Sequence, residues 1–282
     1  MVASHHLTIP AGTGSPDMAD GSVLFIGDAT LLIRYAGFTI LTDPTFIHMH
    51  ERVSIGYGMH STRLTNPALE IADLPPIDLI ILSHFHRDHF DQVAERDLDK
   101  SLPIVTTADA AKEVNKLGFS NTFSLETWAP VMVEKGDARL RITSTPGRHG
   151  PPMSEIVMPE VMGSMLEFSA GSEQVLFRMY ITGDTLIYDD IHEIPRRFPD
   201  VNLAILHLVG ARVLGVMVTM DAEQGVEMIR IINPDHALPV HFNDSGVFTS
   251  PLSDFQREVE AAGLSDRVHY LNHGGSYSFA VS

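Results

Sequence analysis

The alternation of apolar and polar positions predicts a β-rich first half, followed by strands that alternate with helices. Short runs of β-branched and other apolar residues, separated by Gly, Asp and Asn, have the length and composition of strands. These runs cover residues 22–27, 29–37, 38–44, 78–83, 103–107, 129–136, 138–147, 164–169, 174–184, 201–210, 236–242, 267–272 and 276–282.

Four segments have helical features instead. Residues 220–233 space their apolar side chains at helical intervals behind an acidic first turn, which indicates an amphipathic helix. Residues 90–98, 108–118 and 250–263 also predict helices. Residues 44–77 form a long irregular stretch, and a loop of this length inside a compact domain is usually functional.

No Pro/Gly/Ser-rich linker and no low-complexity tract divides the chain. We therefore expect a single domain at residues 22–282, preceded by a loose N-terminal leader at residues 1–21. Many strands first, and then strands alternating with helices, indicate the α/β fold class, with stacked sheets flanked by helices.

Composition narrows the chemistry and the partners that we expect. The chain has 282 residues and a formal net charge of −17, which makes nucleic acid an unfavourable partner. It has no cysteine, so histidine and carboxylate side chains must hold any metal. No apolar run approaches the length of a membrane span, and the N-terminus lacks the pattern of a secretory signal. We expect a cytoplasmic protein without a stable membrane anchor that acts on a small molecule, and a homo-oligomer is compatible with the sequence.

The segment SHFHRDHFD at residues 83–91 concentrates three histidines and two aspartates directly after a predicted buried strand. His84 and His86 are two positions apart, so they point the same way on an extended or tightly turning segment. Asp88 and His89 follow as the chain turns toward a helix. Because burying these groups beside a hydrophobic strand without a metal would be costly, the run favours metal binding. Its spacing suits two metal ions, which still need ligands from elsewhere.

Three further candidate ligands follow predicted strands. His149 lies in TPGRHG, Asp184 in YITGDT and His241 in LPVHFN, each at a strand-to-loop junction. Gly183 would allow the backbone before Asp184 to approach a neighbour closely. Any one of these residues alone is more often a cap or a core residue. Together with the segment at residues 83–91 they indicate a metal site, because ligands cluster at such junctions on sheet-based enzymes.

With these residues, the sequence resembles the metallo-β-lactamase superfamily. SHFHRDH matches its H-x-H-x-D-H signature, and His149, Asp184 and His241 follow in the expected order. FIGDATLLIRYAGFTILTDP resembles its opening strands and carries the usual aspartate as Asp43. Within the superfamily, GDAT, LPPIDLIILSH and TMDAEQGVEMI most resemble the branch that contains ascorbate-6-phosphate lactonase and N-acyl-phosphatidylethanolamine phospholipase D.

The resemblance implies a four-layer αββα sandwich with a dinuclear metal site between the sheet edges. One divalent ion would be bound by His84, His86 and His149. The second would be bound by Asp88, His89 and His241. Asp184 would bridge both ions, and Asp43 would orient a ligand histidine from outside the ligand set. Zinc is expected first, with manganese or iron as alternatives.

The implied reaction is hydrolysis by a metal-bridging hydroxide, because two cations lower the pKa of bound water to near 7. Asp184, as the bridging ligand, and Asp88, as a ligand that also steers a proton, are the expected catalytic residues. A lactone or another ester of a small molecule is the expected substrate. A phosphodiester is the alternative, whether phospholipase D-like, a cyclic nucleotide or a nuclease substrate.

Several residues bear on this choice of substrate. Arg63, Arg148 and Arg212 are candidates for binding an anionic group. His207 stands where relatives more often carry an apolar residue, and we expect it to contact the substrate. Thr219 takes the place of a histidine that often precedes the following helix in the phospholipase-like branch, which disfavours phospholipase activity.

A di-iron redox protein on the same scaffold is a further alternative. Such proteins usually partner a flavin domain, and 282 residues leave no room for one. The acidic composition and the absence of an appended RNA-binding domain disfavour a nuclease.

Overall fold

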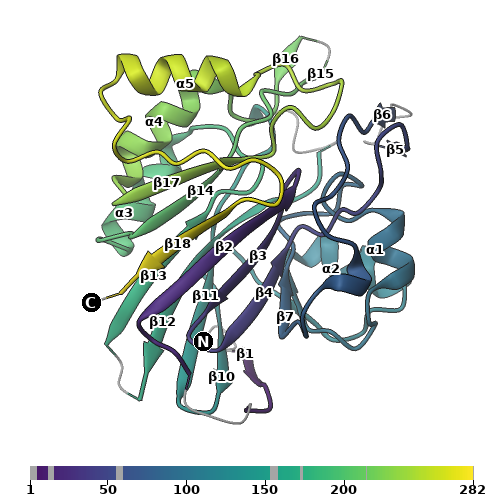
Figure 1. Cartoon of the computed structure of the whole chain (residues 1–282), viewed down its shortest axis with the longest axis vertical. Coiled ribbons are helices and arrows are strands. Elements are labelled where there is room, and N and C mark those ends of the chain that lie inside the picture. Colours follow the sequence, from purple (N-terminus) through teal and green to yellow (C-terminus); the bar gives the residue numbers. More distant parts are fainter. Residues whose placement is uncertain are drawn as a thin grey trace.

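The computed structural model describes residues 5–11, 16–54, 60–152, 158–171, 174–213 and 215–281. Two seven-stranded sheets face each other, and helices cover their outer faces (Figure 1). The first sheet has the strand order β1-β10-β11-β12-β13-β14-β17, and the second has the order β18-β2-β3-β4-β7-β8-β9. This architecture is the αββα sandwich that the resemblance implied.

The strands of both sheets are short, and most are predominantly buried. Those of the first sheet are β1 (His5–Thr8), β10 (Pro130–Lys135), β11 (Ala138–Pro146), β12 (Met162–Ala170), β13 (Val175–Ile181), β14 (Leu203–His207) and β17 (His236–Val240). Those of the second sheet are β18 (Ser276–Ala280), β2 (Asp20–Gly27), β3 (Thr30–Tyr35), β4 (Phe38–Thr42), β7 (Leu79–Ile81), β8 (Ile104–Thr106) and β9 (Thr122–Ser124).

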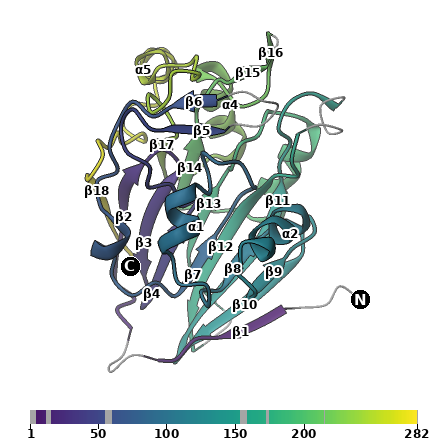
Figure 2. The ribbon, with the colours of Figure 1, turned by 90° about the vertical axis from the view of Figure 1, so that its right-hand side faces the viewer.

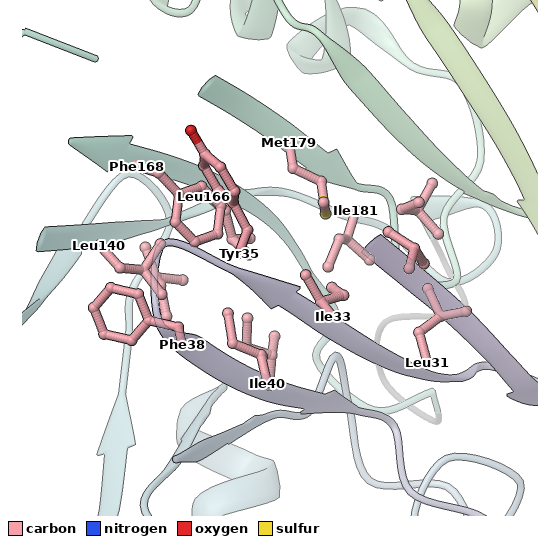
Figure 3. Close-up of a cluster of buried hydrophobic side chains, with 14 of the residues drawn as sticks. Leu31, Ile33, Tyr35, Phe38, Ile40, Leu140, Leu166, Phe168, Met179 and Ile181 are labelled. Carbon is pink, nitrogen blue, oxygen red and sulfur yellow. The ribbon is translucent and has the colours of Figure 1, made fainter. Parts of the chain in front are cut away.

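Side chains from the two facing sheets form the central core. Leu31, Ile33 and Tyr35 alternate along β3, so all three point to the same face of the second sheet. They pack against side chains of the first sheet such as Phe168 and Ile181 (Figure 3). The rings of Tyr35 and Phe168 meet edge to face, with centroids 5.0 Å apart. This apolar layer holds the two sheets together, and their strand ends can therefore build one site.

Helices form the two outer layers. The first sheet is covered by α3 (Glu193–Arg197), α4 (Ala222–Ile232) and α5 (Leu252–Ala261). The second sheet is covered by α1 (Gln92–Asp97) and α2 (Ala108–Lys116). Within the part of the chain that the structure describes, no helix combines the length and the apolar character needed to cross a membrane.

Two segments differ from the sequence-based expectation. Residues 5–8, expected in a loose leader, form β1 and pair in parallel with β10 at the edge of the first sheet. This four-residue strand is held mainly by edge pairing, which its short sequence HHLT does not reveal. Residues 267–272, expected as a strand, contribute only an isolated bridge between Ala237 and Val268. The sequence pattern also did not predict the short elements β9 and α3.

Two small hairpins lie at one end of the sandwich. The first, β5 (Arg52–Ser54) with β6 (His60–Thr62), belongs to the long stretch at residues 44–77, of which residues 55–59 lie outside the described residues. The second is β15 (Arg212–Val213) with β16 (Val216–Met217). Figures 1 and 2 both show the two hairpins at the upper end of the molecule.

Candidate metal centre

The segment at residues 83–91 leaves β7 and carries four of the expected ligands. His84 and His89 are buried, whereas His86 and Asp88 are partly exposed. His84 Nε2 lies 3.0 Å from His86 Nδ1, so these two ring nitrogens point toward a common position. The local turn places this part of the H-x-H-x-D-H motif around one point.

The turn is fixed by a cap on the helix that follows. Asp91 accepts hydrogen bonds from the amides of Val93 and Ala94, at 2.9 Å and 2.8 Å, and so begins α1. Its other carboxylate oxygen accepts a hydrogen bond of 2.7 Å from the amide of Ile47. The cap therefore also ties the ligand segment to the chain that follows β4.

The other three expected ligands follow strands of the first sheet. His149 follows β11, Asp184 follows β13 and His241 follows β17, and all three are buried. Gly183 has a φ of +61°, and a Cβ built there would lie 2.7 Å from the carbonyl oxygen of Met162. A side chain would not fit at this position, so glycine allows Asp184 to sit where it does.

The expected ligands meet in overlapping groups whose donor atoms lie within 4.8 Å of one another. The groups are His84, His86 and His149; Asp88, His89 and His241; and His84, His89 and Asp184. Asp184 Oδ2 lies 3.5 Å from His89 Nε2 and 3.6 Å from His241 Nε2. All seven residues are thus brought together, with Asp184 beside ligands of the second group.

Several buried atoms at this centre take part in no hydrogen bond within the described residues. They are Asp88 Oδ1, His89 Nε2, Asp184 Oδ1 and His241 Nε2. Leaving such atoms unpaired is costly unless a ligand completes them. Imidazole and carboxylate donors without thiolate are typical of zinc and manganese sites. The residues present therefore fit a metal centre.

Asp43, directly after β4, holds the expected ligand His89 in place. Its Oδ2 lies 3.2 Å from His89 Nδ1, and its Oδ1 accepts a 2.7 Å hydrogen bond from the Ser83 amide. This contact engages Nδ1 and leaves Nε2 of the same ring facing Asp184. Asp43, His89 and His207 also form a group whose donor atoms lie within 4.8 Å of one another, so the role of Asp43 outside the ligand set stays a prediction.

His207 is one of the candidate substrate contacts. It ends β14, is buried, and stacks on His89 with ring centroids 6.0 Å apart. Its Nε2 lies 3.5 Å from Asp43 Oδ2. His207 thus ends a strand expected from the sequence and lies beside the expected ligand His89, and its contact with substrate stays a prediction.

Asp28 is a site residue that the sequence analysis missed. It lies in the turn between β2 and β3 with a φ of +56°, and its Oδ1 is hydrogen bonded to Nδ1 of the expected ligand His241. His241 itself has a φ of +58°, and its amide donates a 2.7 Å hydrogen bond to the Asp28 carbonyl. The available signal was an aspartate in the GDAT turn, which pairs with a residue 213 positions away in the chain.

The three histidines of the first group have lowered pKa values. Burial is the main cause for each, and neighbouring imidazoles add to it. The pKa values of His86 and His149 are lowered to about 4, and the pKa of His84 is well below its ordinary value. These rings are neutral at pH 7, which is the form that binds a metal ion.

The second group has the opposite electrostatics. Burial opposes a charge on His241, but Asp184 and Asp28 outweigh it and raise the pKa of His241 to about 10. In the same way Asp184 and Asp43 raise the pKa of His89 well above its ordinary value. Burial raises the pKa of Asp184, yet the two histidines bring it well below its ordinary value. Asp184, Asp43 and Asp28 therefore favour positive charge at this end of the centre.

The raised pKa of His241 predicts how the stability of the metal-free protein depends on pH. The charged ring between Asp184 and Asp28 stabilises the folded state below the ordinary histidine pKa of 6.5, and this contribution is lost as the pH rises through about 10. The melting temperature of chelator-treated protein should fall by roughly several degrees between pH 7 and pH 10. In His241→Asn the same decrease should be smaller, and an equal decrease would contradict the assignment.

The remaining candidate residues lie around the centre. Arg63 was expected to bind substrate. The structure instead buries it in an ion pair with Asp28. Arg212 is exposed on β15, with a guanidinium nitrogen 3.8 Å from Asp221, and its substrate role stays a prediction. Thr219 is buried and its hydroxyl donates a 3.3 Å hydrogen bond to Asp184 Oδ2.

Comparison with known proteins places this chain among related sequences and folds. Residues 39–242 match the family model described as the Beta-lactamase superfamily domain. UPF0173 protein YddR of Bacillus subtilis is 28% identical over 263 residues, which are 90% of this chain and 98% of that protein. A UPF0173 metal-dependent hydrolase of Rubrobacter xylanophilus is 24% identical over 211 residues, 73% of this chain and 80% of that protein.

A solved structure shares the fold. The isothiocyanate hydrolase from Delia radicum gut bacteria has a TM-score of 0.77 and 21% sequence identity, over 92% of this chain and 100% of that one. The family model covers most of the present chain, from β4 to the residue after His241. The chain therefore belongs to the metallo-β-lactamase superfamily, and it is a metal-dependent hydrolase.

Proposed function

We propose that this hydrolase cleaves a lactone or another ester of a small molecule, at a site for two divalent metal ions. One observation carries the two-ion part of the proposal. Donor atoms of seven buried or partly buried residues converge in overlapping groups, and four of these atoms have no hydrogen-bond partner within the described residues. A single ion with the four ligands usual for zinc would leave several of these donors uncompensated.

The ligands divide between two positions. His84, His86 and His149 would hold one ion. Asp88, His89 and His241 would hold the other, and Asp184 lies where it can bind both. Bound divalent ions supply hydroxide near neutral pH and draw electron density from the scissile carbonyl or phosphoryl group. The imidazole and carboxylate donors favour zinc, with manganese or iron as alternatives.

Residues around the ligands set their orientation and charge. Asp43 and Asp28 each bind Nδ1 of a ligand histidine, which leaves Nε2 facing the metal position. Thr219 donates a hydrogen bond to Asp184 Oδ2 and so orients this carboxylate. Burial raises the pKa of Asp88, which favours a role in steering a proton, whereas metal binding uses the ionised form of the same carboxyl group.

Apolar side chains near His241 support a lactone or ester substrate. The ring of Phe248 packs edge-on against His241, with centroids 4.8 Å apart. Val247, which precedes Phe248, and Leu64, whose amide is bonded to the Asp244 carbonyl, are 36% and 48% exposed. Because exposed apolar side chains beside a polar centre favour contact with apolar ligand groups, a neutral ester suits this end of the site.

A phosphodiester is the second candidate, and Arg148 is the observation that favours it. This residue directly precedes the ligand His149, and its guanidinium lies 4.0 Å from the ring centroid of Tyr188. Its buried Nε has no hydrogen-bond partner within the described residues, so it is a candidate for binding a phosphate oxygen.

A panel of model substrates tests the proposal. With zinc added, we expect γ- and δ-lactones and p-nitrophenyl esters to show a kcat/KM at least about tenfold above that of bis(p-nitrophenyl) phosphate. An isothiocyanate in the same panel tests the activity named for the structural neighbour. Preference for the phosphodiester would favour the second candidate, and inactivity on both esters and lactones would contradict the proposed substrate class. Metal analysis of protein purified without added metal distinguishes zinc or manganese from a di-iron centre.

A further inference from the structure

Arg63 is a buried guanidinium that contacts two separate parts of the chain. Its side chain is 2% exposed, and its Nη1 forms an ion pair with Asp28 Oδ2. Its Nη2 lies 3.9 Å from Asp244 Oδ1. Asp244 also accepts a 3.0 Å hydrogen bond from the Asp28 amide through its Oδ2. The guanidinium therefore joins the β2–β3 turn to the segment that follows β17.

Asp28 divides its carboxylate between Arg63 and the metal centre. One oxygen is paired with Arg63, and the other is hydrogen bonded to Nδ1 of the ligand His241. Burial raises the pKa of Asp28, but Arg63 and then His241 outweigh it and lower the pKa overall. Without the guanidinium, a buried carboxylate would lose a compensating charge and one of the two contacts that fix its orientation.

The backbone of Arg63 holds the hairpin segment in place. Its amide donates a 2.9 Å hydrogen bond to the Glu51 carbonyl, and its carbonyl accepts one of 2.9 Å from the His50 amide. An isolated bridge joins Arg63 to Ser245, and the next amide, that of Leu64, donates to the Asp244 carbonyl at 2.9 Å. The same residue thus secures the chain next to β6 and contacts the partner of His241.

We propose that Arg63 is a positioning residue that holds Asp28 against His241. Through these contacts it couples the ordering of residues 60–66 to cation binding at the His241 end of the centre. This inference rests on the proposed two-ion site. A cation held by His241 favours the orientation of Asp28 that Arg63 also favours. By reciprocity of linked equilibria, an ordered segment at residues 60–66 strengthens cation binding there, and cation binding orders the segment.

The test compares Arg63→Met, which keeps much of the side-chain volume, with Arg63→Lys, which keeps the charge but has no fork to span two carboxylates. Zn²⁺ titration calorimetry measures each cation affinity, and hydrogen exchange follows residues 60–66 with and without metal. In Arg63→Met we expect one cation, which we assign to the His241 end, to lose about 10- to 100-fold in affinity, with the other unchanged. Metal should slow exchange at residues 60–66 in the wild type but not in this variant.

Arg63→Lys should recover part of the affinity, and it serves as the test if Arg63→Met does not fold. The matched control is Arg139→Met, which removes an exposed arginine of β11 that is paired with Glu134 of β10. It should leave both affinities unchanged. Wild-type affinity in Arg63→Met, or an equal loss at both positions without rescue by lysine, would overturn the inference.

The proposed two-ion site fails separately, if wild-type protein binds one cation per chain. In that case the inference on Arg63 holds only if the single cation slows hydrogen exchange at residues 60–66 and its affinity decreases in Arg63→Met.

Discussion

Replacing Asp184 by asparagine is expected to remove at least one metal ion per chain and to lower kcat/KM about a thousandfold or more. The substitution keeps the shape of the side chain but removes the charge that faces His89 and His241, at 3.5 Å and 3.6 Å from Asp184 Oδ2. It also replaces a carboxylate oxygen with an amide group that cannot bind a cation equally well. Metal content by elemental analysis and turnover of the best panel substrate measure the two effects.

The control for this variant is Asp190→Asn, an exposed aspartate in the 3₁₀ helix Asp189–His192 that follows Asp184 in the chain. It should keep full metal content and turnover. Two metal ions per chain together with full activity in Asp184→Asn would show that the site has been assigned wrongly.

The clustering of the expected ligands was within reach of sequence reasoning because its signal is partly local. His84, His86, Asp88 and His89 lie within six consecutive residues after one buried strand. The other ligands follow strands, and the facing sheets bring those strand ends to one place. The fold class followed for the same reason, since apolar runs of strand length alternate with helical segments. Local patterns therefore carried both predictions.

The contacts behind the ligands could not be predicted in this way. Asp28 and His241 are 213 positions apart, and nothing in either local sequence indicates that they meet. The sequence around Arg63 predicts an ordinary surface arginine, yet the side chain is buried beside Asp28 and Asp244 from distant segments. His207 is polar but ends a buried strand. Such positions depend on tertiary packing, so periodicity and composition give no measure of their burial.

Removing one histidine from each ligand group distinguishes two ions from one. His149→Leu removes a donor from the group of His84 and His86, and His241→Leu removes a donor from the group of Asp88 and His89. Leucine fills most of the space and offers no ligand atom. If two ions bind, each variant should retain about one ion per chain and lose about a thousandfold in kcat/KM.

The double variant sharpens this test. Residues that act as a unit in catalysis are not additive, so His149→Leu with His241→Leu should bind no metal tightly but be little less active than either single variant. His192→Leu, which removes an exposed histidine of the 3₁₀ helix Asp189–His192, is the matched control. Loss of all bound metal in either single variant would instead indicate one shared ion position. Melting curves in chelator identify any variant whose loss of metal reflects unfolding, because a folded domain gives a cooperative transition and an unfolded chain gives none.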